Sequence, residues 1–154
     1  MKIVLLLSPF NSLSAAGFTT TSVKRIYGCS MPLGIAGLAA ILEKAGHQVA
    51  VLDPCPLQLP VPEIAEWVKK EKPDVLGISA LTHTAKNAYA VAEAVKKELP
   101  DLPIIMGGSH CTVWPNLAIE ECPAIDVSVI GEAEERILPL VDPVVKKSGL
   151  QNIK

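Results

Sequence analysis

Short apolar runs alternate along the chain with longer segments in which apolar residues recur every three or four positions. The short runs are continuous and rich in Val, Ile and Leu, which favours strands buried on both faces. The runs that we expect to form strands are Ile3–Leu7, Gln48–Leu52, Asp74–Ser79, Leu102–Met106 and Asp126–Ile130.

A predicted helix follows each predicted strand. The helix over Pro32–Ala45 has proline in its first turn, and Gly46 follows as a stop signal. The helix over Thr84–Leu99 has the clearest apolar stripe. The remaining predicted helices are Pro62–Lys70, Pro115–Glu121 and Glu132–Lys147, and we expect Pro139 and Pro143 to interrupt the last of them.

This alternation predicts an α/β fold, in which helices cover both faces of a parallel sheet. We expect a flavodoxin-like (Rossmann-like) three-layer sandwich with a five-stranded sheet in the order 2-1-3-4-5. One long irregular segment, Pro9–Met31, follows the first strand. Folds of this kind bind ligands at the carboxyl ends of their strands, so we expect this segment to be functional.

Composition narrows the class of protein. The 154 residues fit one domain, and 49% apolar against 19% charged residues excludes intrinsic disorder. A net charge of −2 and 4% aromatic residues argue against nucleic-acid binding as the main task. The first apolar run is too short for a signal peptide and no run is long enough to span a membrane, so we expect a cytoplasmic protein.

The four cysteines are Cys29, Cys55, Cys111 and Cys122. Their spacing matches no zinc motif, CxxC redox motif or iron–sulfur motif. We therefore expect reduced thiols rather than a metal centre or a disulfide framework.

The loops at the predicted carboxyl edge of the sheet are rich in small and hydroxyl-bearing residues. These loops contain Ser8–Pro9, Ser79–Thr84, Gly107–His110 and Gly131–Glu132. A diglycine lets a ligand approach the backbone closely and allows positive φ angles, although a simple tight turn would also explain it.

Several familiar sites are absent from the sequence. No GxGxxG follows the first strand, no GxxxxGK[ST] occurs, and the acidic residues of a phosphoacceptor receiver are missing. We expect His47 at the opposite edge of the sheet, whereas His83 and His110 fall on the ligand side. A metal pair there would lack an acidic third ligand, so ligand hydrogen bonding or simple exposure explains these histidines better.

The chain resembles the cobalamin (B12)-binding domain, in the version at the N-terminus of B12-dependent radical SAM enzymes. The matching stretches, in this order, are Met1–Pro9, Met31–Asp53, Pro73–Thr84, Leu102–Thr112 and Asp126–Glu134. The fingerprint of the classical B12 domains is DxHxxG, then SxL, then GG. Ser79-x-Leu81 and Gly107–Gly108 match its later parts, but Gly34 or Met31 stands where the cobalt-ligating histidine would be.

The resemblance implies that the chain binds cobalamin base-off, without a protein histidine on cobalt. It implies a tail pocket lined by Ser79, Leu81 and Thr82, with Gly34 and the Pro9–Met31 segment below the corrin. The cofactor-binding residues that we expect are Ser8, Pro9, Gly34, Ser79, Leu81, Thr82, Gly107, Gly108, Ser109, His110, Gly131 and Glu132. We expect no catalytic residue and no metal-ligating side chain in this chain.

The radical SAM signature CxxxCxxC is absent from the chain. We therefore expect residues 1–147 to form the cobalamin-binding domain and 148–154 to begin a linker. In the parent enzyme, expected to be a methyltransferase, a downstream domain would hold the 4Fe-4S cluster and S-adenosylmethionine, and the isolated chain would not be catalytic. Two alternatives remain open: a flavodoxin-like docking or recognition module that has lost B12, and a small α/β enzyme using His83 or His110.

Overall fold

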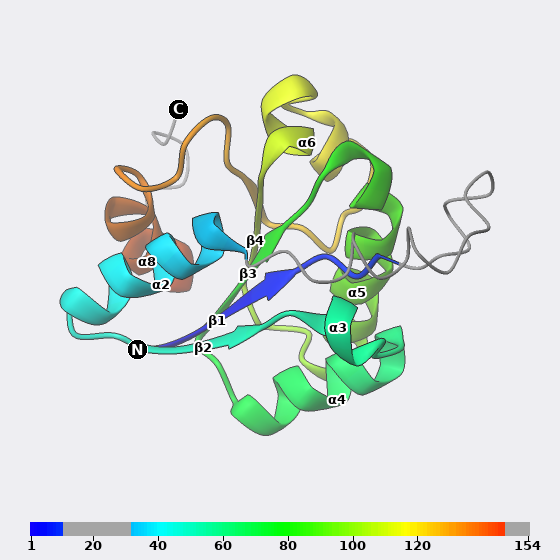
Figure 1. Ribbon diagram of the computed structural model, residues 1–154, viewed down its shortest axis with the longest axis horizontal. Helices are drawn as coiled ribbons and strands as arrows, with labels where there is room; N and C mark the ends of the chain where they lie inside the picture. Colours follow the sequence, from blue (N-terminus) through cyan, green and yellow to red (C-terminus); the bar gives the residue numbers. More distant parts are fainter. Residues whose placement is uncertain (11–31, 147–154) are drawn as a thin grey trace.

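The fold is a sheet of five parallel strands with helices on both faces (Figure 1). The structure is a computed structural model that describes residues 1–10 and 32–146. The strand order is β2-β1-β3-β4-β5, which confirms the predicted 2-1-3-4-5 arrangement.

The three inner strands of the sheet are buried more deeply than the two edge strands. The strands are β1 (Lys2–Leu7), β2 (Gln48–Leu52), β3 (Val75–Ser79), β4 (Ile104–Gly107) and β5 (Val127–Ser128). Across the centre of the sheet, Leu5 pairs with Gly77 and Gly77 pairs with Ile105. All strands are parallel, so their carboxyl ends meet at one edge.

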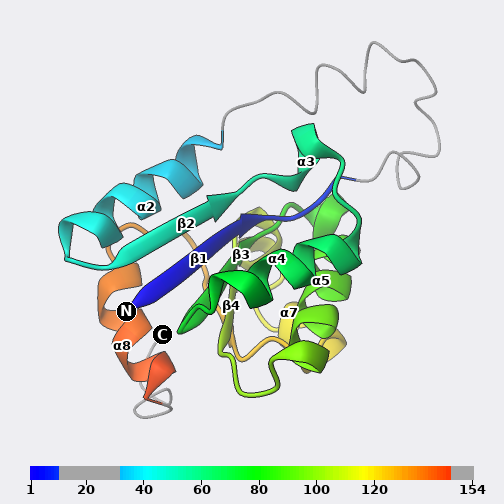
Figure 2. The same cartoon turned by 90° about the horizontal axis from the view of Figure 1, so that it is seen from below.

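Helices α2 (Leu33–Lys44) and α8 (Ile137–Val145) cover one face of the sheet (Figure 2). Their apolar residues pack on side chains that point to this face, including Ile3, Leu5 and Ile105. Leu42 of α2 and Leu140 of α8 are almost completely buried in this core.

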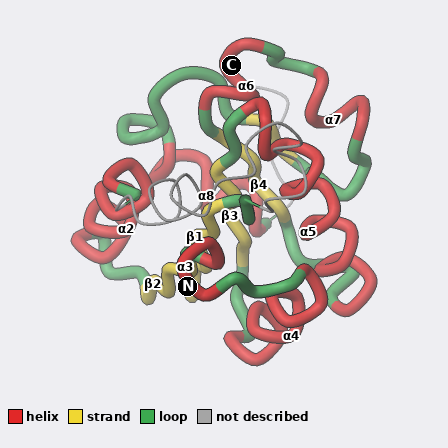
Figure 3. Tube along the Cα trace, turned by 45° about the vertical axis from the view of Figure 1, so that its right-hand side comes forward, coloured by secondary structure: helices red, strands yellow, loops and turns green. Residues whose placement is uncertain are grey.

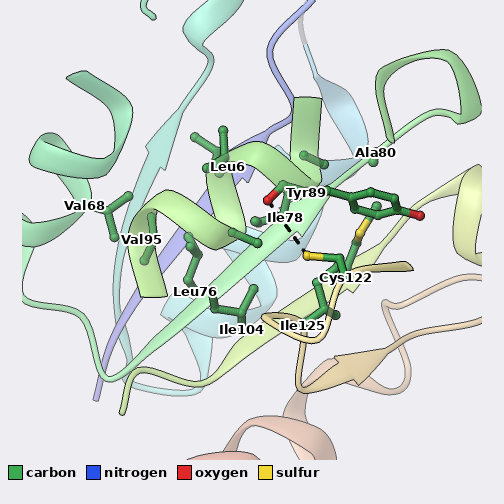
Figure 4. Close-up of a cluster of buried hydrophobic side chains, with 14 of the residues drawn as sticks. Leu6, Val68, Leu76, Ile78, Ala80, Tyr89, Val95, Ile104, Cys122 and Ile125 are labelled. Carbon is green, nitrogen blue, oxygen red and sulfur yellow. Dashed lines mark hydrogen bonds between the residues drawn. The ribbon is translucent and has the colours of Figure 1, made fainter. Parts of the chain in front are cut away.

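Helices α4 (Val61–Glu71), α5 (Ala85–Glu98) and α7 (Leu117–Glu121) cover the other face. Their core contains Leu6, Leu76 and Ile104 from the strands. Figure 4 shows the part of it where Cys122 lies beside Tyr89, with the thiol Sγ 3.9 Å from the Tyr89 carbonyl oxygen. The sheet therefore separates two apolar cores.

Three short helices at the carboxyl ends of the strands were not predicted as separate elements. They are α3 (Pro54–Leu57), η1 (Thr82–Thr84) and α6 (Ser109–Val113), and Figure 3 shows α3 and α6 among the longer helices. Each is too short to produce a 3.6-residue apolar repeat, which is the signal that the sequence analysis used.

The last helix and the last two strands differ most from their predicted bounds. Helix α8 begins at Ile137 rather than Glu132, because 133–136 form a turn in which the backbone N–H of Arg136 donates to Ala133. It also continues through Pro139 and Pro143. Pro139 lies in the first turn, where a backbone N–H has no helical partner to lose. Strand β4 lies slightly later than Leu102–Met106, and β5 is shorter than Asp126–Ile130.

Two of the predictions lie largely outside the described residues. These are the functional role of the segment after Pro9 and the start of a linker at 148–154. In the part of the chain that the structure describes, no helix has both the length and the apolar character needed to cross a membrane.

Candidate ligand site at the carboxyl edge of the sheet

A cavity of about 70 Å³ lies between the sheet and the helices α2 and α8, near the carboxyl ends of β3 and β4. Its walls are apolar. The large side chains that line it are Leu5, Ile35, Leu38, Ile105, Val129 and Ile137. The cavity therefore lies within the apolar core that α2 and α8 form with the sheet.

Small residues on one face of the sheet leave this space empty. Gly77, Ser79 and Gly107 all line the cavity, and Ser79 pairs with Gly107 across β3 and β4. A Cβ atom at Gly77 would lie 2.9 Å from Cδ2 of Leu5, whereas one at Gly107 would have its nearest neighbour, Cβ of Val129, at 3.8 Å. Side chains at these glycines would occupy the cavity or its floor.

Gly108 also lines the cavity, but its missing side chain first serves the fold of its own loop. The residue has a φ of +99°, and a Cβ atom there would lie 2.6 Å from the carbonyl oxygen of Ala80. It would also lie 3.2 Å from Oγ of Ser79. The diglycine thus combines a wall that is open to a ligand at Gly107 with a close backbone contact at Gly108.

The carboxyl ends of β1 and β3 are joined by a small hydrogen-bond network. The Ser8 N–H donates to the Ser79 carbonyl at 2.9 Å. Oγ of Ser8 lies 2.5 Å from Oγ1 of Thr84, which also accepts from the Leu81 N–H at 3.1 Å. Ser8 and Thr84 are both buried. This network fixes the loop after β3 against the end of β1.

Ser8 and Pro9 face the α5 side of the edge and do not line the cavity. The Pro9 carbonyl accepts a hydrogen bond from Nδ2 of Asn87 at 2.8 Å. Sγ of Cys55 lies 3.7 Å from the Ser8 carbonyl oxygen, and burial raises the pKa of this thiol. Through these contacts, Ser8 and Pro9 fix the carboxyl end of β1 against α3 and α5.

Thr112 of α6 connects the loops that follow β4 and β5. Its Oγ1 donates to the Gly108 carbonyl at 3.2 Å and accepts from the Gly131 N–H at 3.0 Å. Gly131 has a φ of +76°, which glycine adopts without steric cost. Thr112 could not be identified from the sequence, because a single hydroxyl-bearing residue inside a short helix belongs to no recognisable pattern.

The two histidines on this edge do not form a pair. His110 is buried, and its Nε2 lies 2.8 Å from the Tyr89 hydroxyl on α5. His83 is exposed and contacts the ring of Phe10 edge to face, at 5.5 Å between ring centres. Among the described residues, no three His, Cys, Asp or Glu side chains are placed to hold a metal ion.

The other expected site residues lie at the same edge but outside the cavity. Gly34 is exposed in the first turn of α2. Leu81 is 50% exposed, and its neighbour Thr82 is also exposed. Ser109 is exposed at the start of α6, and Gly131 and Glu132 are exposed in the loop after β5. These exposed residues and the apolar cavity therefore lie at the same edge of the sheet.

Gly77 was not among the expected site residues, although the sequence marks it. A glycine inside an apolar strand marks a bulge or a close approach of another group, and Gly77 lies two positions before Ser79 on the same face. That signal could have identified it. The helix residues Ile35, Leu38 and Ile137 carried no such signal, since apolar residues are expected there in any case.

Comparison with known proteins gives a family match over most of the chain. The family model described as the B12 binding domain matches residues 20–141. An uncharacterised methyltransferase of Pyrococcus horikoshii is 37% identical over 99% of this chain and 31% of its own length. The cobalamin-dependent radical SAM methyltransferase TokK of Streptomyces tokunonensis is 31% identical over 68% of this chain and 15% of its own length.

Solved structures show the same fold. The radical S-adenosylmethionine methyltransferase TsrM of Kitasatospora setae, with cobalamin and a [4Fe-4S] cluster bound, superposes with a TM-score of 0.74 at 16% identity. The match covers 99% of this chain and 26% of TsrM. The chain therefore spans less than a third of the length of these relatives.

Proposed function

The chain belongs to the B12-binding domain family, and from this premise we propose that it binds cobalamin at the carboxyl edge of its sheet. The nucleotide tail would enter the cavity beside Gly77 and Gly107. The observation that carries this assignment is the cavity itself, which lies at the ligand-binding edge of the fold and exists because two strand residues lack side chains.

The residues around the cavity have defined roles in this proposal. The apolar walls from α2 and α8 would cover the base of the tail and exclude water from it. Ser79 would donate a hydrogen bond to the base, because its hydroxyl is a side-chain donor in the lining. The exposed edge residues Gly34 and Leu81 would lie below the corrin.

We further propose that cobalamin is bound base-off and without a protein histidine on cobalt. Residues 29–37 contain no histidine. His110 is engaged with Tyr89, and His83 does not line the cavity. Bound cobalamin supplies a cobalt centre that can carry a methyl group. This chain holds that centre in place.

The 37% identity to a methyltransferase over nearly the whole chain supports the same role for the parent protein. In this proposal a radical SAM domain elsewhere in the parent holds the 4Fe-4S cluster and S-adenosylmethionine. Residues 1–147 would act as the cobalamin-binding domain, and 148–154 would begin the linker to the radical SAM domain.

Binding is tested by titrating the purified chain with hydroxocobalamin and following the visible spectrum. We expect a stoichiometric complex for the natural chain. Gly107→Val should lose it, because the added side chain enters the cavity while Cβ itself has room. Gly37→Ala is the matched control, since a Cβ at Gly37 meets nothing within 4 Å. A natural chain that folds but binds no cobalamin would overturn the proposal and leave the docking module and the small α/β enzyme as the alternatives.

The state of the cobalt is tested by electron paramagnetic resonance of the Co(II) form. We expect no nitrogen superhyperfine splitting from an axial ligand, and no change in the spectrum for His83→Ala. Splitting from an imidazole or benzimidazole nitrogen would overturn the base-off, histidine-free assignment without affecting the binding proposal.

A further inference from the structure

We propose that the cavity selects among cobamides by their lower base, and that it prefers benzimidazoles to purines. Cobamides are the cofactors of the B12 class, which share the corrin and differ in the base at the end of the nucleotide tail. This inference rests on the proposed function, because it assumes that the tail enters the cavity.

The side chains around the cavity offer very few polar atoms. Among the residues described as lining it, Ser79 is the one whose side chain carries a hydrogen-bonding group. The opposing walls are hydrocarbon from Leu38 of α2, Ile105 of β4 and Ile137 of α8. A base in this cavity would leave water and meet one hydroxyl.

The backbone carbonyls beside the cavity are already engaged. The Ser79 carbonyl accepts from the Ser8 N–H, and the Gly107 carbonyl accepts from the Ala80 N–H, each at 2.9 Å. The Gly108 carbonyl accepts from both the N–H and the hydroxyl of Thr112, each at 3.2 Å. The bonds of the Ser79 and Gly107 carbonyls run along the sheet to the next strand or its loop, so these oxygens point away from the cavity on the face of the sheet. Both lone pairs of the Gly108 carbonyl are taken.

This arrangement matches the chemistry of a benzimidazole. When it is not bound to cobalt, a benzimidazole has one free ring nitrogen, which accepts one hydrogen bond, and the rest of its edge is carbon. Adenine adds further ring nitrogens and an exocyclic amino group. Those atoms would lose their hydrogen bonds to water without finding partners, and buried polar groups without partners weaken binding.

The test compares the affinities of four ligands for the purified chain, from changes in the visible corrin spectrum. The ligands are cobalamin, an adenine-based cobamide, a p-cresol-based cobamide and cobinamide, which has no nucleotide tail. We expect the adenine form to bind about tenfold or more weakly than cobalamin. Equal affinity of these two would overturn the inference, as would cobinamide binding as tightly as cobalamin.

Two substitutions in the lining sharpen the comparison. Val129→Thr adds a hydroxyl at nearly constant volume, and we expect it to narrow the gap between adenine and benzimidazole forms. Ser79→Ala should weaken cobalamin several-fold and leave the p-cresol form unchanged, since that base has no ring nitrogen. Val113→Thr is the control, because Val113 is 60% exposed and does not line the cavity.

The failures of the two proposals can be told apart. If no corrinoid binds to the folded chain, the proposed function itself is wrong. If all the cobamides bind with equal affinity, cobalamin binding stands and the base selection is wrong. An unchanged ratio in Val129→Thr would also count against selection by the cavity wall.

Discussion

Gly108 and Gly131 both have positive φ angles but lie in different surroundings. Their φ angles are +99° and +76°, both in the region that residues with a side chain avoid. A Cβ at Gly108 would lie 2.6 Å from the carbonyl oxygen of Ala80, whereas one at Gly131 would meet nothing within 4 Å. A side chain at Gly108 would therefore meet a close backbone contact that one at Gly131 would not.

We expect Gly131→Ala to lower the free energy of unfolding by about 1 kcal/mol, which is the cost of the conformation alone. Gly108→Ala should lower it by about 3 kcal/mol, because overpacking against fixed backbone is added. Urea unfolding of both variants measures the difference. Equal losses would show that the loop after β3 moves away freely.

The raised pKa of Tyr89 predicts that the free energy of unfolding falls at high pH. Burial raises its pKa to about 12, with a smaller contribution from the nearby Glu121 carboxylate. The folded state therefore holds the phenol proton more tightly than the unfolded state, whose pKa is about 10. The stabilisation is complete below pH 10 and is lost as the pH rises through 12, by at most about 3 kcal/mol.

The measurement is the free energy of unfolding between pH 9 and 12 for the natural chain and for Tyr89→Phe. We expect a shallower decline in the variant, although its stability at neutral pH is lower because His110 loses its partner. Parallel curves would exclude Tyr89 as the titrating group.

At the scale of elements, the sequence was sufficient where a repeat is long. The 14 residues of α5 carry a clear apolar stripe, and the continuous runs of β1 and β3 indicate burial on both faces. Helix α6 has 5 residues, fewer than two turns, so no repeat could reveal it. The start of α8 was predicted too early because the glutamates among residues 132–135 are as typical of the first turn of a helix as of an exposed turn.

The site was predictable to the extent that it lies in loops. Ser79, Gly107 and Gly108 were expected from the motif, and all three line the cavity. His110 was expected to face the ligand, but its ring contacts Tyr89 on the opposite side of the sheet. A sequence places a loop at an edge, whereas the packing of neighbouring helices decides to which face of the sheet each side chain turns.

Helices α2 and α8 should respond to cobalamin more than the rest of the protein. They wall the cavity, whereas α4 and α5 pack on the opposite face of the sheet. We expect hydroxocobalamin to slow amide hydrogen exchange in α2 and α8 and to leave α4 and α5 nearly unchanged. Slowing confined to α4 and α5 would place the ligand on the wrong face for this proposal.

At the scale of the whole molecule, stability comes from the two apolar cores rather than from surface charge. The ion pairs Lys69–Glu98 and Lys70–Glu66 have well-exposed side chains, and pairs of this kind contribute little. The two cores differ, because the one beneath α2 and α8 contains the cavity. The domain is therefore less tightly packed on the side where its ligand is proposed to bind.

The cavity beneath α2 and α8 should affect how the volume of the protein changes when it unfolds. Unfolding eliminates internal voids, so pressure favours the unfolded state in proportion to them. The volume change of unfolding scales with such voids without equalling them, so a cavity of about 70 Å³ contributes at most about 40 mL/mol, or about 1 kcal/mol of destabilisation per 100 MPa. The natural domain without ligand should therefore unfold at a lower hydrostatic pressure than the Gly107→Val variant. Fluorescence of Trp67 and Trp114 under pressure would report the unfolding. Cobalamin should confer the same resistance to compression as the added side chain, since both would fill one space.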